Sequence, residues 1–159
     1  MHNKKYKETY RELSHGTDVE SATIIRNNGF KISERSDSWC GPGIYFYDIK
    51  KKAWWAARRK CSEIKKETGK KVEPTVLFAD IIDIETDKIF DLRAYKDLCD
   101  FEEKITPLLG EYSFELSGMN ETEKIIQLRS LFISYYAEKN DKKLIIGNFR
   151  QRPQPMYEH

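Results

Sequence analysis

The feature that most constrains the fold is a nearly continuous apolar run at residues 76–82, which only Asp80 interrupts. The surrounding stretch, residues 75–84, has the strongest strand pattern in the chain, because β-branched and other apolar side chains dominate it. A strand that is apolar on both faces is typical of the interior of a sheet. We therefore predict a central strand over residues 75–84.

Strand and helix patterns mix irregularly along the rest of the chain. Shorter strands are predicted at residues 10–14, 43–47, 89–92 and 143–149. Apolar residues at helical spacing predict helices at residues 19–28, 50–67, 95–109 and 121–139. Because no regular βαβ rhythm connects these elements, the pattern predicts the fold class α+β.

Local sequence also predicts where the helices end and which face the last one buries. Thr17 or Asp18 is expected to cap the first helix, and Asp48 the second. Gly29 and Gly69 are expected to end these two helices. The last helix is expected to bury Ile125, Leu128, Leu131, Phe132 and Tyr135.

The composition fits one domain spanning residues 1–159. Charged residues make up 34% of the chain and hydrophobic residues 39%, which is typical of a soluble globular protein. No apolar run approaches the roughly 20 residues that a membrane span needs, and no apolar stretch follows the N-terminus as in a signal peptide. We therefore expect a cytoplasmic protein with no membrane partner.

The three cysteines, Cys40, Cys61 and Cys99, lack the spacing of a metal site, and no metal site is predicted. Their odd number fits reduced thiols in a cytosolic protein. Cys40 lies beside the Gly41-Pro42-Gly43 segment. Because no histidine neighbours Cys40 in the sequence, it is not expected to be a catalytic thiol.

Charge is distributed unevenly, although the formal net charge is only +2. Residues 50–71 hold ten lysines and arginines against two glutamates, whereas residues 80–123 are mostly acidic. The small net charge argues against a dedicated nucleic-acid-binding protein. The basic stretch is interpreted as either a solvated helix face or a surface that meets phosphates.

Two short segments carry the residues that suggest chemistry. His15 and Gly16 stand at the predicted end of the strand at residues 10–14, where a glycine lets a ligand approach the main chain. Tyr45 follows Gly43 in another predicted strand, and its ring can stack on a flat ligand. Taken singly, such a histidine is usually structural and a Gly-Pro-Gly segment is typical of a turn. Together they are interpreted as a cleft for a flat, polar ring.

Four segments occur along the chain in a recognisable order: His15-Gly16-Thr17, Asn28-Gly29-Phe30, Gly41-Pro42-Gly43-Ile44-Tyr45-Phe46 and Ala53-Trp54-Trp55-Ala56. In this order they resemble the ADP-ribosyltransferase fold of the His-Tyr-Glu type, shared by poly(ADP-ribose) polymerases and diphtheria-toxin-like enzymes. The later segments, residues 75–83 and 91–92, look like those of a group of small uncharacterised bacterial proteins with this fold. The resemblance covers about residues 10–92 and implies a split β-sheet core with flanking helices.

The resemblance implies that the chain binds NAD+ as a substrate, in a cleft between two small sheets. By analogy, His15 bonds the adenosine ribose, the Gly16 backbone pairs with the nicotinamide carboxamide, and Tyr45 packs on the nicotinamide ring. Ala53 stands where the family often has a serine that bonds the carboxamide, a loss of roughly 1 kcal/mol of binding. Further residues expected to bind the cofactor are Thr17, Gly43, Trp54 and Trp55.

The family's third catalytic residue, a Glu (sometimes Gln or Asp) at the start of a late strand, has no obvious counterpart. The last predicted strand, residues 143–149, contains no acid. Gln151 follows this strand and is the expected third catalytic residue, beside His15 and Tyr45. Asp141 precedes the strand and is interpreted as a turn residue.

The activity that the resemblance implies is NAD+-dependent mono-ADP-ribosyl transfer to a protein or a nucleic acid. Such an enzyme fits a bacterial or phage toxin, defence or effector protein, with an antitoxin or immunity protein as a further partner. The first alternative is an inactive module that binds NAD+ or ADP-ribose, which the missing third residue favours. The second is an RNA 2′-phosphotransferase of related fold. It needs arginines that hold phosphate, and no matching motif contains Arg26, Arg35, Arg58 or Arg59.

Overall fold

The computed structural model describes residues 6–32, 39–110 and 121–149, with the backbone alone for residues 121–127. The chain divides into two compact units. The first unit comprises residues 1–34 and 42–86, and the second comprises residues 35–41 and 87–159. Helices and a two-stranded sheet occur in each unit, so the protein is mixed α and β, compatible with the predicted α+β class. That residues 1–159 form one domain stays a prediction.

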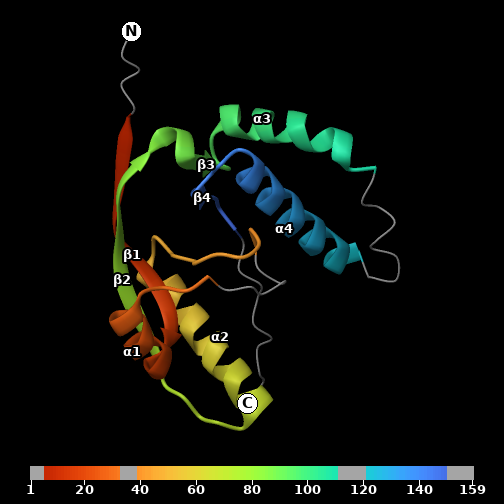
Figure 1. Cartoon of the computed structure of the whole chain (residues 1–159). Coiled ribbons are helices and arrows are strands. Elements are labelled where there is room, and N and C mark those ends of the chain that lie inside the picture. Colours follow the sequence, from red (N-terminus) through yellow and green to blue (C-terminus); the bar gives the residue numbers. More distant parts are fainter. Residues whose placement is uncertain (1–5, 33–38, 111–120, 150–159) are drawn as a thin grey trace. The chain divides into compact units, whose positions relative to one another are not determined.

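The first unit is built on an antiparallel ribbon of two long strands, β1 (Lys7–Asp18) and β2 (Pro74–Glu85), shown in Figure 1. Their pairing is regular over the C-terminal half of β1, and it shifts twice nearer the start of this strand. The strand predicted at residues 10–14 is longer than expected. His15 and Gly16 therefore lie inside β1 and not at its end.

The strand predicted at residues 75–84 is confirmed as β2, but its predicted place inside a sheet is wrong. Among the described residues, β2 pairs only with β1. Phe78 and Ile82 are 56% and 62% exposed, although their apolar side chains suggested burial on both faces. Apolar content thus predicts the strand, whereas its burial depends on which other elements cover it.

The helix α1 (Val19–Asn28) follows β1 directly, and its predicted ends are confirmed. The Asp18 carboxylate accepts a hydrogen bond of 2.9 Å from the Ser21 N–H, so Asp18 and not Thr17 is the N-cap. Gly29 follows the helix with φ 79°, and its N–H donates to a carbonyl in the last turn.

The helix α2 (Lys50–Thr68) begins differently from its prediction. Its N-cap is Ile49, whose side chain makes no capping hydrogen bond, so the prediction of Asp48 as the cap is wrong. The helix begins one residue too late for that role, and Asp48 pairs instead with Lys52 at 3.4 Å. The predicted end is confirmed, because Gly69 takes the left-handed conformation with φ 73°.

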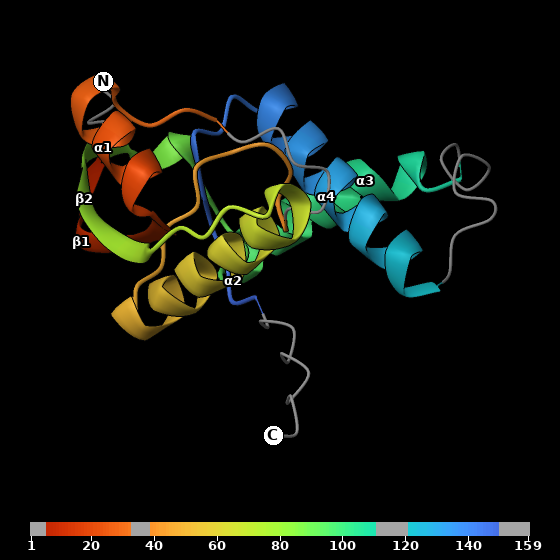
Figure 2. The ribbon, with the colours of Figure 1, turned by 90° about the horizontal axis from the view of Figure 1, so that it is seen from below.

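One face of α2 packs against β1 through small side chains. Ala53, Ala57 and Cys61 are the buried residues of this helix, and they recur every four residues along one stripe. Figure 2 shows α2 from below as the long helix beside the ribbon of β1 and β2. Small residues on this stripe let the two backbones approach closely.

The second unit combines two helices, α3 (Tyr95–Ile105) and α4 (Glu121–Lys139), with a parallel pair of short strands, β3 (Ile89–Asp91) and β4 (Leu144–Ile146), as Figure 1 shows. Both strands are shorter than predicted. Short 3₁₀ helices precede β3 and follow α3: η1 (Thr86–Lys88) and η2 (Thr106–Leu108). Pro107 lies in η2, which explains why α3 ends before the predicted residue 109.

The core of the second unit is aromatic. The Phe90 ring on β3 lies 4.5 Å from the Tyr136 ring on α4, measured between centroids. The buried residues of this core are Phe90, Ile105, Phe132, Ile133 and Tyr136.

The buried face predicted for α4 is correct only in part. Phe132 is buried and Leu128 and Tyr135 pack against the core, but Leu131 is 43% exposed. Ile133 and Tyr136 take its place, because the buried stripe is rotated around the helix from the predicted one. The side chain of Ile125 lies outside the described residues.

Candidate functional site

The two segments singled out in the sequence meet at one edge of β1. The Ser14 N–H donates to the Tyr47 carbonyl at 2.8 Å, and the Tyr47 N–H donates to the Ser14 carbonyl at 2.7 Å. This pair is an isolated antiparallel bridge, and residues 44–46 are not in a strand. The strand predicted at residues 43–47 is therefore wrong, although its predicted closeness to His15 is confirmed.

The bridge ends because His15 takes the next acceptor. A continued antiparallel ladder would place Gly16 opposite Tyr45 and join their backbone groups. The Tyr45 carbonyl oxygen lies instead 2.8 Å from Nδ1 of His15. A side chain of β1 thus holds the neighbouring segment where a backbone bond of the ladder would otherwise form.

The backbone of Gly16 faces this interrupted edge. In a regular antiparallel strand, the N–H and C=O of one residue point to the same side, and successive residues alternate. Ser14 points to Tyr47, whereas Val19, directly after β1, points to the β2 side and donates to Glu73 at 3.0 Å. Gly16, two residues from Ser14, therefore directs its N–H and C=O to the edge where the ladder has stopped.

The hydrogen bond to Tyr45 fixes the tautomer of His15. A carbonyl oxygen only accepts, so Nδ1 carries the proton and Nε2 of the neutral ring is an acceptor. Burial lowers the pKa of His15, the hydrogen bond to Tyr45 raises it, and the charge of Lys60 lowers it further. The net effect is a lowered pKa, so His15 is neutral at pH 7.

Two phenylalanines hold the imidazole in place. The Phe30 ring meets it edge-on at 5.1 Å, and the Phe46 ring lies 5.8 Å away, between centroids. The sequence named Phe30 and Phe46 only as parts of longer motifs. Two features of the sequence could have identified them. Phe30 directly follows Gly29, and Phe46 directly follows Tyr45.

Gly16 also has a packing role that the sequence did not reveal. A Cβ atom at Gly16 would lie 1.9 Å from the Ala53 carbonyl oxygen and 2.8 Å from the Ala57 nitrogen. Because both atoms belong to the backbone of α2, no side-chain movement relieves this clash. Glycine is thus required here for α2 to pack on β1, while its pairing with a ligand stays a prediction.

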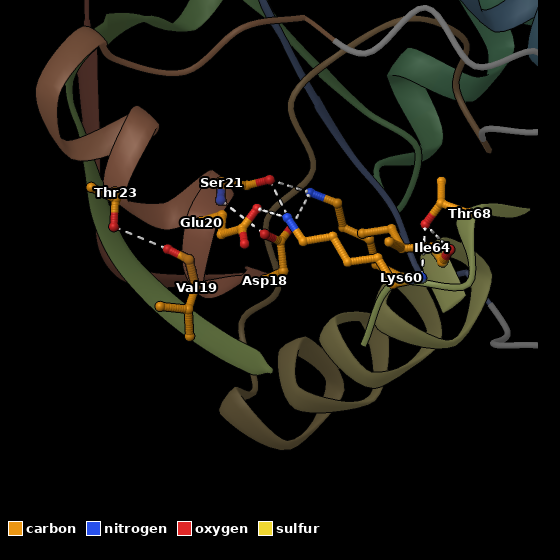
Figure 3. A network of polar contacts seen from close by, with 9 residues as sticks. Asp18, Val19, Glu20, Ser21, Thr23, Lys60, Ile64 and Thr68 are labelled. Carbon is orange, nitrogen blue, oxygen red and sulfur yellow. Dashed lines mark hydrogen bonds and ion pairs between the residues drawn. The ribbon is translucent and has the colours of Figure 1, made fainter. Parts of the chain in front are cut away.

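Thr17 belongs to a part-buried polar network that joins β1, α1 and α2. Figure 3 shows the part of this network around Asp18, Ser21 and Lys60. The Thr17 hydroxyl accepts a hydrogen bond of 2.8 Å from Nζ of Lys60. The same ammonium lies 2.9 Å from the Asp18 carboxylate and 3.0 Å from the Ser21 hydroxyl. The structure thus gives the Thr17 side chain an internal partner, and its predicted contact with a cofactor stays a prediction.

This network determines the charge state of Asp18, whose side chain is only 4% exposed. Burial alone raises the pKa of Asp18, but two hydrogen bonds from Ser21 and the contact with Lys60 outweigh it. The pKa is held well below its usual range. Asp18 is therefore a carboxylate that the fold already uses for capping and ion pairing.

The remaining expected ligands of the first unit are half-buried. Gly43 leaves ordinary room for a side chain, because its Cβ would lie 3.7 Å from the Tyr45 ring. On α2, the Arg58 guanidinium lies 5.9 Å from the Trp54 ring and that of Arg59 lies 5.7 Å from the Trp55 ring. Whether these side chains touch a ligand stays a prediction.

The expected third catalytic residue, Gln151, lies outside the described residues. Asp141 takes a left-handed backbone conformation with φ 50°, as expected of a turn residue. Contacts with Lys143 and Lys88 lower its pKa to about 2. Asp141 is therefore ionised and bound to two lysines near the start of β4.

None of the three cysteines, all of which are described, forms a disulfide. Burial raises the pKa of Cys40 to about 12, against a smaller lowering by Arg129, so it is a thiol at neutral pH. The described residues contain no group of three side chains suited to hold a metal ion. No helix among the described residues is long and apolar enough to span a membrane.

No protein-family model matches the sequence, and no curated protein or solved structure matches it. The candidate site is therefore defined by the geometry of this chain. Its centre is the edge of β1 between the Ser14–Tyr47 bridge and Gly16, with His15 fixed beside it.

Proposed function

We propose that the first unit binds the nicotinamide end of NAD+ at the interrupted edge of β1. The observation that carries the proposal is the backbone of Gly16, which faces this edge where the pairing with residues 44–46 has stopped. A primary carboxamide carries an NH2 donor group and a carbonyl acceptor on the same carbon atom. It can therefore replace the missing strand by bonding both the C=O and the N–H of Gly16.

Tyr45 and His15 supply the other contacts in this proposal. Tyr45 is half-buried, and in this proposal its ring packs on the nicotinamide ring. Nε2 of His15 accepts a hydrogen bond from a ribose hydroxyl, because Nδ1 is committed to the Tyr45 carbonyl. Both residues are positioned by the same hydrogen bond, so the contacts to ring and ribose are set together.

The chain is then an NAD+-dependent mono-ADP-ribosyltransferase with the split β-sheet core of that fold. The bond between nicotinamide and C1′ of the ribose breaks, and both electrons go to the ring nitrogen, so nicotinamide leaves uncharged. A nucleophile of the target attacks C1′ and loses its proton. The protein contributes mainly by positioning the substrate and stabilising the positive charge that develops on the ribose.

The proposed third catalytic residue is Gln151, and the acceptor is a protein or a nucleic acid. A bacterial or phage toxin, defence or effector protein is the role that fits this activity, with an antitoxin or immunity protein as partner. We place this role in the cytoplasm, where NAD+ is abundant.

The second candidate is a module of the same fold that binds NAD+ or ADP-ribose without turnover. The late strand favours it, because residues 143–149 contain no acid at the place where the family has its catalytic carboxylate. Without such a carboxylate, the positive charge that develops on the ribose is less well supported.

The experiment is calorimetry with NAD+, followed by measurement of released nicotinamide after incubation with cell extract. Wild-type protein is expected to bind NAD+ and to release nicotinamide, and Tyr45→Ala to lose both. Tyr45→Phe is the matched control, because it keeps the ring and the backbone carbonyl that binds His15. Binding with no release supports the second candidate, and absence of binding contradicts both.

A further inference from the structure

The face of α2 that points away from β1 is strongly basic. Relative to the buried stripe of Ala53, Ala57 and Cys61, the basic side of the helix covers rotations of about 80° to 220°. Glu63 borders this side at about 240° and pairs with Arg59 at 3.0 Å, and every other charged residue on it is a cation. We call it the basic face, and it consists of Lys51, Lys52, Trp55, Arg58, Arg59, Ser62, Lys65 and Lys66.

Three cations on this face follow one another at intervals of seven residues. Lys51, Arg58 and Lys65 are all exposed. In the part of the chain that the structure describes, none of the three forms an ion pair with a carboxylate, whereas Lys52 and Arg59 do. Seven residues span about 10.5 Å along a helix, so the three form a line of positive charge on one side.

Planar groups lie between these charges. The Arg58 guanidinium covers the Trp54 ring, and the Arg59 guanidinium covers the Trp55 ring. Each arginine is oriented by the ring below it, which reduces the entropy that it loses on binding. Arginine planes and aromatic rings are the surfaces on which unpaired bases stack.

We propose that the basic face of α2 binds single-stranded nucleic acid. The lysines and Arg58 contact phosphates, and the paired arginine and tryptophan planes meet the bases. A membrane surface fits less well, because the apolar stripe of α2 is buried on β1 and the outer face carries no aliphatic side chain. This binding needs no NAD+ chemistry, so it can be tested independently of the proposed enzymatic activity.

The test measures binding of a fluorescein-labelled oligouridine by anisotropy over a range of salt concentrations. The key variant is Lys51→Gln/Arg58→Gln/Lys65→Gln. Each lost phosphate contact lowers the salt slope by about 0.7 for a single strand, so the slope is expected to fall by about 2. At about 0.1 M salt the affinity is expected to drop at least about 10-fold.

Two further variants separate position from charge. Lys7→Gln/Lys31→Gln/Lys96→Gln removes the same charge from exposed lysines outside α2 and is expected to bind like the wild type. Lys51→Arg/Arg58→Lys/Lys65→Arg keeps the charge of the face and is expected to retain most of the affinity. Thermal unfolding shows whether each variant is folded. If the triple variant does not fold, Arg58→Gln alone replaces it, with a salt slope expected to be lower by about 0.7.

The proposal is overturned if wild-type protein does not bind the oligouridine, or if the face variant and the control lose affinity equally. It is also overturned if a duplex of equal length or a phosphatidylserine vesicle binds the protein as tightly as the single strand. A single-stranded DNA of the same length is expected to bind within about 10-fold of the RNA, because the contacts are to phosphates and base planes.

Discussion

Nδ1 of His15 lies 2.8 Å from the carbonyl oxygen of Tyr45, and this hydrogen bond replaces the backbone bond that a continued ladder would give to Tyr45. It joins the two segments that the sequence singled out. It also fixes the imidazole tautomer and leaves the backbone of Gly16 facing an interrupted edge. The proposed nicotinamide site depends on this one contact.

Gly16 is predicted to be indispensable for stability. Gly16→Ala places a methyl group against the backbone of α2 and is expected to cost about 3 kcal/mol or more in the free energy of unfolding, or to prevent folding. Gly43→Ala is the control, since its Cβ meets only ordinary contacts and is expected to cost less than about 1 kcal/mol. Urea unfolding measures both, and equal losses would contradict the packing role of Gly16.

Asp18 is predicted to make folding sensitive to acid. Its pKa is lower in the folded protein than the unfolded value of about 3.9. The stabilisation it gives is therefore complete above that value and is lost as the pH falls through the folded pKa.

The variants Asp18→Asn and Asp18→Ala separate the two roles of this side chain. Asn keeps a side-chain cap for α1 and loses the charge next to Lys60, whereas Ala loses both. Asp18→Ala is expected to cost about 1 kcal/mol more than Asp18→Asn at pH 7. Unfolding curves recorded between pH 7 and pH 3 provide the check, and a wild-type acid sensitivity retained in Asp18→Asn would refute this assignment.

His15 is predicted to titrate below its unfolded pKa of about 6.5, because burial disfavours the charged ring. The unfolded chain then binds more protons in this range, so the contribution of His15 to stability rises as the pH approaches 6.5 from below. NMR titration of the ring measures the midpoint. Phe30→Ala uncovers the ring and is expected to raise the midpoint, so an unchanged or lower value in this variant would speak against burial as the cause.

Thiol reactivity is predicted to differ among the cysteines. Burial raises the pKa of Cys40 to about 12, whereas Cys99 is exposed on α3. Iodoacetamide at about pH 8 is expected to modify Cys99 well before Cys40, since the thiolate is the reactive form. Peptide mass spectrometry after brief labelling identifies the order, and faster modification of Cys40 would contradict its burial.

Local chemistry explains which features were predictable from the sequence. Asp18, Gly29 and Gly69 mark helix ends because capping depends on a few neighbouring residues. The same holds for the apolar run of β2, whose side chains favour a strand wherever it lies. These features need no information about distant parts of the chain.

Contacts between distant segments account for what the sequence did not predict. The exposure of Phe78 depends on what covers β2, and the need for glycine at position 16 depends on how closely α2 approaches. The irregular course of residues 44–46 follows from the bond between His15 and Tyr45. Each is a tertiary relationship that periodicity does not encode.

The most direct test of the proposed nicotinamide site follows the backbone amide of Gly16 by ¹H–¹⁵N NMR while NAD+ is added. We predict that this amide resonance shifts downfield on saturation, because the carboxamide oxygen accepts its hydrogen bond, and that nicotinamide alone shifts it in the same direction. Nicotinic acid, which cannot donate to the Gly16 carbonyl, is expected to bind more weakly and so to shift the resonance less at equal concentration. A Gly16 resonance that stays in place while NAD+ saturates the protein would contradict the proposed site.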